Sequence, residues 1–287
     1  MERRPYVIGI AAILGAALCW STGGLLIKLV DLPPLKIALY RSLISSLCLA
    51  LVAGRGGWRR LKPGAAWVVL SYALVVDLFV VANKWTTAAN AILLQYTAPV
   101  WVMALGPFIA RARPRPADAA AVAAALGGLL LVFADHVDAT GARGNWVALA
   151  SGVCFALMML LMRRERATPL LHTVALGNLA AVALALPWVW PDLGLDRRQA
   201  GLLVILGAGQ LGLGYILFTV AIRRLPALEV SLLALLEPVL NPLWVFLGQG
   251  ERPGPLALAG GGVVVTALAL HAISTAHRFA GPDRPDR

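Results

Sequence analysis

Ten apolar runs of about twenty residues dominate the sequence, and short polar segments separate them. A helix needs roughly 20 apolar residues to cross the hydrocarbon core of a bilayer. The 287 residues are 60% hydrophobic and 14% charged, with a mean hydropathy of +0.79, which excludes an ordinary soluble protein. The sequence therefore predicts an all-α membrane protein with ten transmembrane helices. The expected helices are 7–29, 35–53, 65–82, 88–110, 117–134, 145–162, 170–190, 200–222, 227–248 and 255–275.

Lysine and arginine are distributed unevenly between the two sets of loops. If the N-terminus is cytoplasmic, seventeen of the 25 lie at cytoplasmic ends and seven at outer ends, and Arg41 lies inside a helix. Cytoplasmic loops of membrane proteins collect Lys and Arg, so the bias predicts that both termini are cytoplasmic, with residues 276–287 as a polar tail. Topology thus explains the net charge of +11, and no nucleic-acid partner is expected.

Cysteine spacing and the first apolar run exclude two other interpretations. Cys19, Cys48 and Cys154 lie in separate apolar runs, so we expect no disulfide, no metal site and no cofactor. The first run follows Arg3 and Arg4 but is longer than the apolar core of a signal peptide, so we expect a retained helix.

An internal repeat relates the two halves of the chain. LLQYTAPVWVMALGP, residues 93–107, aligns without a gap on LLALLEPVLNPLWVF, residues 232–246, and this offset of 139 places Pro99 on Pro238. We therefore expect one five-helix repeat in residues 1–137 and a second in 138–275. An odd number of crossings inverts the second copy in the membrane. Inverted repeats with interrupted helices are typical of secondary transporters, whose substrate site lies near mid-membrane between the repeats.

Several short motifs resemble those of a known family. They are WST at residues 20–22, ANAILLQYTAPV at 89–100, LLEPV at 235–239 and GQGERP at 248–253. With five plus five helices, they resemble the drug/metabolite transporter superfamily, EamA type, over nearly the whole chain. The start of the first helix also resembles the aromatic amino acid exporter of that family. One departure is Ala112, which stands where the second half has Glu251.

Prolines and polar groups recur inside the predicted helices four and nine. Each proline removes a backbone donor and crowds the preceding turn, so Pro99, Pro107, Pro238 and Pro242 predict kinks. In lipid, the freed carbonyls need partners, so both helices are expected to line a central cavity rather than merely to pack as bent helices.

Glu237 is expected near mid-membrane, about 15 Å into helix nine. A charge there is costly unless it is paired, hydrated or protonated. Asn241 and Trp244 follow on the same helical face. Contact with a substrate amine, a proton relay and a structural hydrogen bond all remain open for Glu237.

Arg41 and Asp77 are predicted at similar depths in helices two and three, roughly 8 to 9 Å from the outer ends. Equal depth predicts an ion pair that acts as a structural contact or a gate; the alternative is that Arg41 extends independently toward the interface.

Deep aromatic and polar side chains are expected to complete a pocket for a flat or apolar substrate with a charged end. With Glu237, Asn241 and Trp244, the predicted substrate-binding residues are Trp20, Ser21, Tyr72, Asn90, Gln95, Tyr96, Trp101 and Tyr215.

These features favour a secondary transporter of the bacterial inner membrane that exports small amphipathic metabolites, amino acids above all, by alternating access. The chain lacks the G-x-x-x-x-G-K-[ST] motif that would predict ATP hydrolysis. Asp77, Glu229 and Glu237 are the carboxylates available for proton coupling. A nucleotide-sugar or drug carrier is the alternative, and a membrane enzyme is disfavoured because the nucleophile and metal motifs are missing. Small-molecule substrates and the bilayer are the expected partners, and a monomer is plausible.

Overall fold

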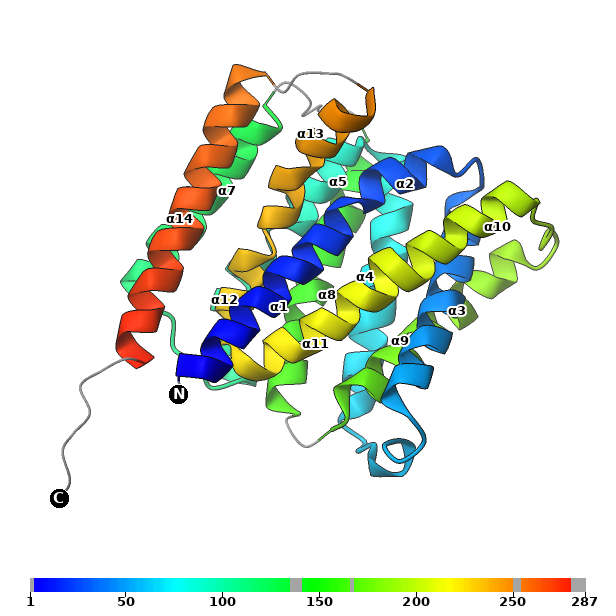
Figure 1. Ribbon diagram of the computed structural model, residues 1–287, viewed down its shortest axis with the longest axis horizontal. Helices are drawn as coiled ribbons and strands as arrows, with labels where there is room; N and C mark the ends of the chain where they lie inside the picture. The colour runs from blue at the N-terminus through cyan, green and yellow to red at the C-terminus, as the bar shows by residue number, and fades with distance from the viewer. Residues whose placement is uncertain (1–2, 135–140, 166–167, 250–253, 280–287) are drawn as a thin grey trace.

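A computed structural model describes residues 3–134, 141–165, 168–249 and 254–279. Within these residues the regular elements are all helical (Figure 1). They are α1 (Arg3–Ser21), α2 (Gly23–Leu29), α3 (Pro34–Ala53), η1 (Trp58–Arg60), α4 (Ala65–Trp85), α5 (Ala88–Gln95), α6 (Ala98–Ile109), α7 (Pro116–Val132), α8 (Ala142–Arg164), α9 (Leu170–Val189), α10 (Arg197–Val204), η2 (Ile205–Leu213), α11 (Gly214–Arg224), α12 (Ala227–Leu233), α13 (Leu236–Gln249) and α14 (Pro255–Phe279).

These elements group into the ten predicted crossings. Eight helical segments are long and apolar enough to span a membrane, and α7 is a shorter apolar helix, among the described residues. Three of the eight correspond to predicted helices that the structure divides: α1 with α2, α5 with α6, and α10 with η2 and α11. The remaining crossing, the ninth in chain order, is α12 followed by α13. The prediction of an all-helical membrane protein is thus confirmed.

The contacts between helices repeat when the two halves are exchanged. The most extensive contacts outside the α7–α14 and α3–α9 pairs are α4 with α8 and α1 with α11. The α4–α8 pair joins crossings three and six, and the α1–α11 pair joins crossings one and eight. Exchanging the two halves replaces three by eight and six by one, so it turns one pair into the other. The α3–α9 and α7–α14 pairs, crossings two with seven and five with ten, map onto themselves. This pattern is expected for two five-helix repeats.

Local chemistry explains several helix ends. Thr87 caps α5, because its hydroxyl accepts a hydrogen bond from the Asn90 amide at 3.1 Å. Asp196 and Gln199 form a capping box at the start of α10, with the Gln199 amide 2.7 Å from Asp196 Oδ1. These polar caps supply partners to amides that the helix itself leaves unpaired.

The middle of crossing eight is a π-helix, Ile205–Leu213, which the sequence did not predict. It contains Gly207, where a Cβ atom would lie 2.8 Å from the Arg41 carbonyl oxygen on α3. The missing side chain at Gly207 therefore lets α3 approach closely at Arg41, the residue that carries a buried guanidinium. π-helical turns occur frequently at functional sites.

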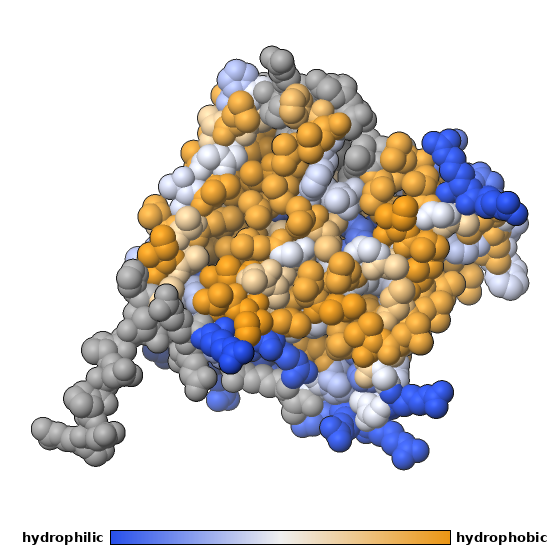
Figure 2. All heavy atoms as spheres, in the orientation of Figure 1, coloured by the Kyte–Doolittle hydropathy of each residue, from blue (hydrophilic) through white to orange (hydrophobic). Residues whose placement is uncertain are grey.

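Hydrophobic residues cover most of the molecular surface in the middle of the molecule, and hydrophilic residues gather at the ends (Figure 2). In this view, hydrophilic side chains lie where α1 begins and, farther right along the lower edge, at the loop between α3 and α4 (Figures 1 and 2). This distribution fits a bilayer around the waist of the molecule.

Candidate functional site

Crossings four and nine are both interrupted, at matching places in the two repeats. The first break separates α5 from α6 at Tyr96 and Thr97, and the second separates α12 from α13 at Ala234 and Leu235. Each break therefore brings irregular backbone into the interior, as transporter sites require.

The predicted kink prolines lie at two kinds of position. Pro99 and Pro238 lie in the first turns of α6 and α13, immediately after the breaks, where a proline's fixed φ favours helix initiation. Pro107 lies inside α6, which continues to Ile109, and Pro242 lies inside α13. The interruption in each crossing thus precedes its first proline. The side chains of Asn241 and Pro242 are outside the described part of the structure.

A hydrogen bond joins the two breaks across the repeats. The Tyr96 hydroxyl, from the end of α5, donates to Oε2 of Glu237 in the first turn of α13. This contact holds the Glu237 carboxylate at the junction of the two halves. Both residues belong to the predicted binding set.

A small central cavity of about 60 Å³ lies beside this contact. Five predicted binding residues line it: Trp20, Gln95, Tyr96, Tyr215 and Glu237. Arg41 also lines it, together with residues that the sequence analysis missed. These are Val75, Val76, Phe79, Phe155, Gln210 and Leu211. The missed residues are mostly apolar, and no motif distinguishes them from ordinary packing residues.

Aromatic rings form one wall of the central cavity. The Trp20 ring centroid lies 5.0 Å from that of Tyr215 and 6.3 Å from that of Phe155. Tyr215 contacts the fully buried Tyr72 at 4.6 Å between centroids, so Tyr72 supports the wall from behind. Gly214 makes this packing possible, since a Cβ there would lie 2.3 Å from Trp20 Nε1.

The other predicted binding residues lie away from the central cavity. Asn90 hydrogen-bonds Thr86 and, at 3.1 Å, Asn145, so it ties α5 to α8. Trp101 donates to the Thr97 hydroxyl at 3.1 Å within the break of crossing four. Trp244 donates to the Ser21 hydroxyl at 2.8 Å and ties α13 to α1. These contacts connect helices around the cavity without lining it.

The predicted ion pair between Arg41 and Asp77 is not formed in this structure. Among the described residues, the ion pairs within 4.0 Å are Lys36 with Asp192 and His271 with Asp118. Arg41 is only 3% exposed and its Nε atom has no hydrogen-bond partner; both carboxylate oxygens of Asp77 also lack one. The pairing therefore stays a prediction for another conformation.

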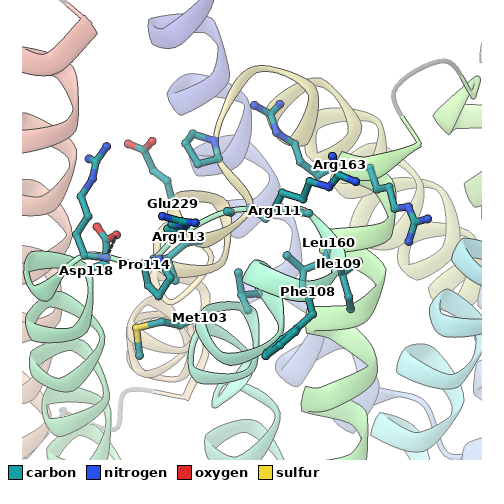
Figure 3. A pocket seen from close by; sticks show the side chains of 18 of the residues that line it. Met103, Phe108, Ile109, Arg111, Arg113, Pro114, Asp118, Leu160, Arg163 and Glu229 are labelled. Atoms are coloured by element: carbon teal, nitrogen blue, oxygen red, sulfur yellow. Dashed lines mark hydrogen bonds between the residues drawn. The ribbon is translucent and has the colours of Figure 1, made fainter.

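A larger cavity, of about 700 Å³, opens at the end of the molecule where the N-terminal helix begins. The ends of α6, α8 and α14 and the starts of α7 and α12 surround it. Figure 3 shows Arg111, Arg113 and Arg163 gathered there with Glu229. Arg115 and Arg164 also line this space, which we call the arginine vestibule. The sequence predicted a cavity at mid-membrane and gave no indication of this larger one.

Buried acidic groups connect the arginine vestibule to the helix packing. Glu229 is 1% exposed, and one of its oxygens accepts a hydrogen bond from the Tyr6 hydroxyl on α1. Asp118 on α7 contacts His271 on α14 at 3.1 Å. Glu229 was considered from the sequence for proton coupling, whereas the cluster around it was not expected.

Comparison with known proteins identifies the family. The chain matches the model of the EamA-like transporter family over residues 7–134 and again over 142–273, most of its length. The chain belongs to the EamA-like transporter family. This EamA-like protein is therefore a multi-pass membrane protein of a transporter family, and the resemblance drawn from its motifs is confirmed.

The relatives of this EamA-like transporter include named exporters. The threonine/homoserine exporter RhtA of Escherichia coli is 29% identical over 205 residues, which are 66% of this chain and 64% of that protein. RhtA of Salmonella typhimurium is 31% identical over 223 residues, 70% of each chain. The pseudopaline exporter CntI of Pseudomonas aeruginosa is 26% identical over 272 residues, 90% of this chain and 94% of that one.

A solved crystal structure shares the fold of this EamA-like transporter. It superposes with a TM-score of 0.83 at 21% identity and covers 97% of this chain and 99% of the other. At this identity, the similarity concerns the fold alone.

Proposed function

We propose that this EamA-like transporter exports small amphipathic metabolites, amino acids above all, by alternating access through the central cavity. The observation that carries the proposal is the Tyr96–Glu237 contact between the two interrupted crossings, beside a cavity lined from both repeats. Secondary transporters bind substrate at such repeat interfaces. The named relatives, which export threonine, homoserine or pseudopaline, support an amino acid or a related metabolite as substrate.

The two cavities suggest a route from one membrane face. The arginine vestibule lies at the end of the molecule where Lys and Arg concentrate, which the charge bias assigns to the cytoplasm. We propose that both termini are cytoplasmic in a bacterial inner membrane, that residues 1–137 and 138–275 form the moving repeats, and that the vestibule is the cytoplasmic entrance.

The chemistry of the central cavity favours a substrate with an aromatic or other neutral side chain. Trp20, Phe155 and Tyr215 offer apolar and aromatic surface, and Glu237 offers a carboxylate for an amine. Deep carboxylates at Asp77, Glu229 and Glu237 are available for coupling to a proton gradient.

A nucleotide-sugar carrier is the second candidate, because five arginines line the vestibule and arginine suits phosphate recognition. The central cavity, in contrast, is lined by a single arginine, Arg41, among its described residues, which leaves a diphosphate with few partners there and disfavours this candidate.

Transport by the purified protein in proteoliposomes tests the proposal. Vesicles preloaded with unlabelled ligand are given labelled threonine, homoserine, phenylalanine or a nucleotide sugar, with and without a pH gradient. We expect counterflow of at least one amino acid and none of the nucleotide sugar. Counterflow of the nucleotide sugar alone would overturn the assignment of substrate class, and dependence on the gradient would identify proton coupling.

A further inference from the structure

We propose that the central cavity recognises a zwitterion: Arg41 binds the carboxylate of the transported amino acid, and Gln210 with Glu237 binds its ammonium group. This inference rests on the proposed function, because it assigns the two ends of the proposed substrate to different side chains that line the same site. From the sequence, Arg41 is predicted to pair with Asp77 as a structural contact or a gate, and no motif points to Gln210.

Arg41 carries a charge that the described residues leave without a close anion. Its side chain lines the central cavity, is 3% exposed and has no hydrogen-bond partner at Nε. A guanidinium remains charged under all physiological conditions, and burying it without a partner is costly. The planar group is well suited to bind a carboxylate through two parallel hydrogen bonds. A ligand carboxylate would therefore supply the anion that Arg41 lacks.

The nearby protein carboxylates do not take that role in this structure. Asp77 and Glu237 both interact electrostatically with Arg41, but neither forms an ion pair with it within 4.0 Å among the described residues. Oε2 of Glu237 is already bound by Tyr96. Acidic side chains thus lie near Arg41, while the N–H groups of its guanidinium remain available to a ligand in the cavity.

Acceptor groups lie around the rest of the cavity. Gln210, in the π-helix, donates through Nε2 to the Trp20 carbonyl at 3.4 Å, and its Oε1 atom is buried without a partner. Glu237 contributes a second carboxylate oxygen beyond the one that Tyr96 occupies. An ammonium group has three donors and no acceptor, so it matches these oxygens. The guanidinium donors of Arg41 and the acceptor oxygens of Gln210 and Glu237 therefore come from different helices around the central cavity.

The cavity volume limits how this site is used. About 60 Å³ corresponds to roughly two water molecules, so the described state has room for only part of an amino acid. A whole substrate requires the cavity to widen, as alternating access provides. The aromatic wall of Trp20, Phe155 and Tyr215 is then available to the side chain.

Competition by matched ligands tests the assignment. In counterflow of labelled L-threonine, the competitors are unlabelled L-threonine, its methyl ester, which lacks the carboxylate, and the corresponding 2-hydroxy acid, which lacks the amine. If threonine is not carried, the fastest substrate among the twenty amino acids and its own two analogues replace this set. We expect the wild type to prefer the amino acid over either analogue by at least about tenfold.

Four variants test the two ends of the site. Arg41→Met should abolish the preference over the ester, and Glu237→Gln should reduce the preference over the hydroxy acid. Arg55→Met removes an arginine from an exposed loop position and should preserve both preferences. Arg41→Lys keeps the charge but not the planar group, so it should retain part of the preference over the ester. It also replaces Arg41→Met in this test if that variant does not fold.

The outcomes distinguish the inference from the function on which it rests. If no amino acid is carried by the wild type, the proposed function fails and this inference fails with it. If amino acids are carried but Arg41→Met, or Arg41→Lys in its place, discriminates against the ester as strongly as wild type does, the inference alone fails.

Discussion

The Tyr96 hydroxyl donates a hydrogen bond to the Glu237 carboxylate and so joins the break of crossing four to the break of crossing nine. The two residues are 141 positions apart, one in each repeat. Because each residue lies next to a helix interruption, the side-chain contact links two places where the backbone is least constrained by its own helix. Any movement of one repeat against the other must stretch or break it.

Replacing Tyr96 by Phe is therefore expected to weaken substrate binding. The change removes the donor that orients Glu237, and a hydrogen bond to a charged group contributes about 1.5–3 kcal/mol. We expect KM for the transported amino acid to rise roughly tenfold or more in counterflow assays. Tyr40→Phe is the matched control, because it removes a tyrosine hydrogen bond, to the Leu193 carbonyl, at a residue that does not line the central cavity. Equal effects of both substitutions would contradict the role of Tyr96.

Replacing Tyr6 by Phe is expected to destabilise the protein. Tyr6 donates to one oxygen of the buried Glu229, whose other oxygen has no partner. Without Tyr6, the carboxyl group is left unsatisfied, at a cost of about 1–3 kcal/mol. Thermal unfolding in detergent should show a lower melting temperature. The loss should shrink when Tyr6→Phe is made in a Glu229→Met background, which removes the acceptor, since a double-mutant cycle then isolates this contact; strict additivity would show that the two residues act independently.

Gly260 is expected to tolerate no side chain. A Cβ atom at this position would lie 2.4 Å from the Gly128 carbonyl oxygen, where α14 meets α7. Gly260→Ala should force the pair apart and destabilise the protein by about 1–3 kcal/mol. Gly262→Ala provides the control on the same helix, because nothing lies within 4 Å of its added Cβ, and it should be neutral or stabilising by up to about 1 kcal/mol. Unfolding of both variants in the same detergent compares them directly.

The ion pair between Lys36 and Asp192 is expected to stabilise the end of the molecule opposite the arginine vestibule. Lys36 is 4% exposed at the start of α3, and its Nζ atom lies 2.9 Å from Oδ2 of Asp192 in the loop after α9. Asp192→Asn should lower the melting temperature, because it leaves a buried ammonium group without its anion. Asp31→Asn changes an exposed aspartate at the same end and should have little effect.

The same pair predicts a dependence on pH. The hydrogen bond from Lys36, followed by that from the Gly194 amide and the charge of Lys36, lowers the pKa of Asp192 below its usual value of 3.8. A lowered pKa in the folded state means that the stabilisation is fully present above pH 3.8 and is lost as the pH falls through the lower folded value. The difference in melting temperature between wild type and Asp192→Asn should therefore persist from neutral pH down to that value and then narrow. A difference that vanishes between pH 5 and 7 would refute this explanation.

Periodicity and length were enough to predict the ten crossings and the repeat. The apolar runs are long and the loops are short, so nearly every predicted helix has a counterpart within a few residues. The break at Tyr96 and Thr97 was signalled by Pro99, since a proline near a helix start leaves the preceding turn interrupted. The π-helix at Ile205–Leu213 had no such signal. Its sequence is apolar and glycine-rich, and its close approach to α3 at Gly207 is a tertiary contact that a single sequence does not encode locally.

The candidate site was predictable only at residues whose burial in the membrane costs free energy. Glu237 was identified because a carboxylate at mid-membrane needs a reason, and it lines the central cavity. Gln210 and Phe155 escaped attention because a glutamine or a phenylalanine in an apolar run is unremarkable until its neighbours are known. Trp244, by contrast, lies near the expected depth but donates to Ser21 instead of lining the cavity. Depth along a helix can be read from sequence, whereas the direction in which a side chain points depends on tertiary packing.

The π-helix in crossing eight has a further consequence for how this protein can change over evolution. A wide turn accommodates one residue more than a regular turn, so it absorbs an insertion without shifting the helix on either side. Deleting a single residue between Ile205 and Leu213 would therefore bring one wide turn back toward ordinary α geometry, whereas the same deletion in a regular helix would rotate one end by about 100° relative to the other. The capped start of α10 and the loop that Asp192 anchors would keep their places. The change would fall on the π-helix itself, and Gln210 lies within it.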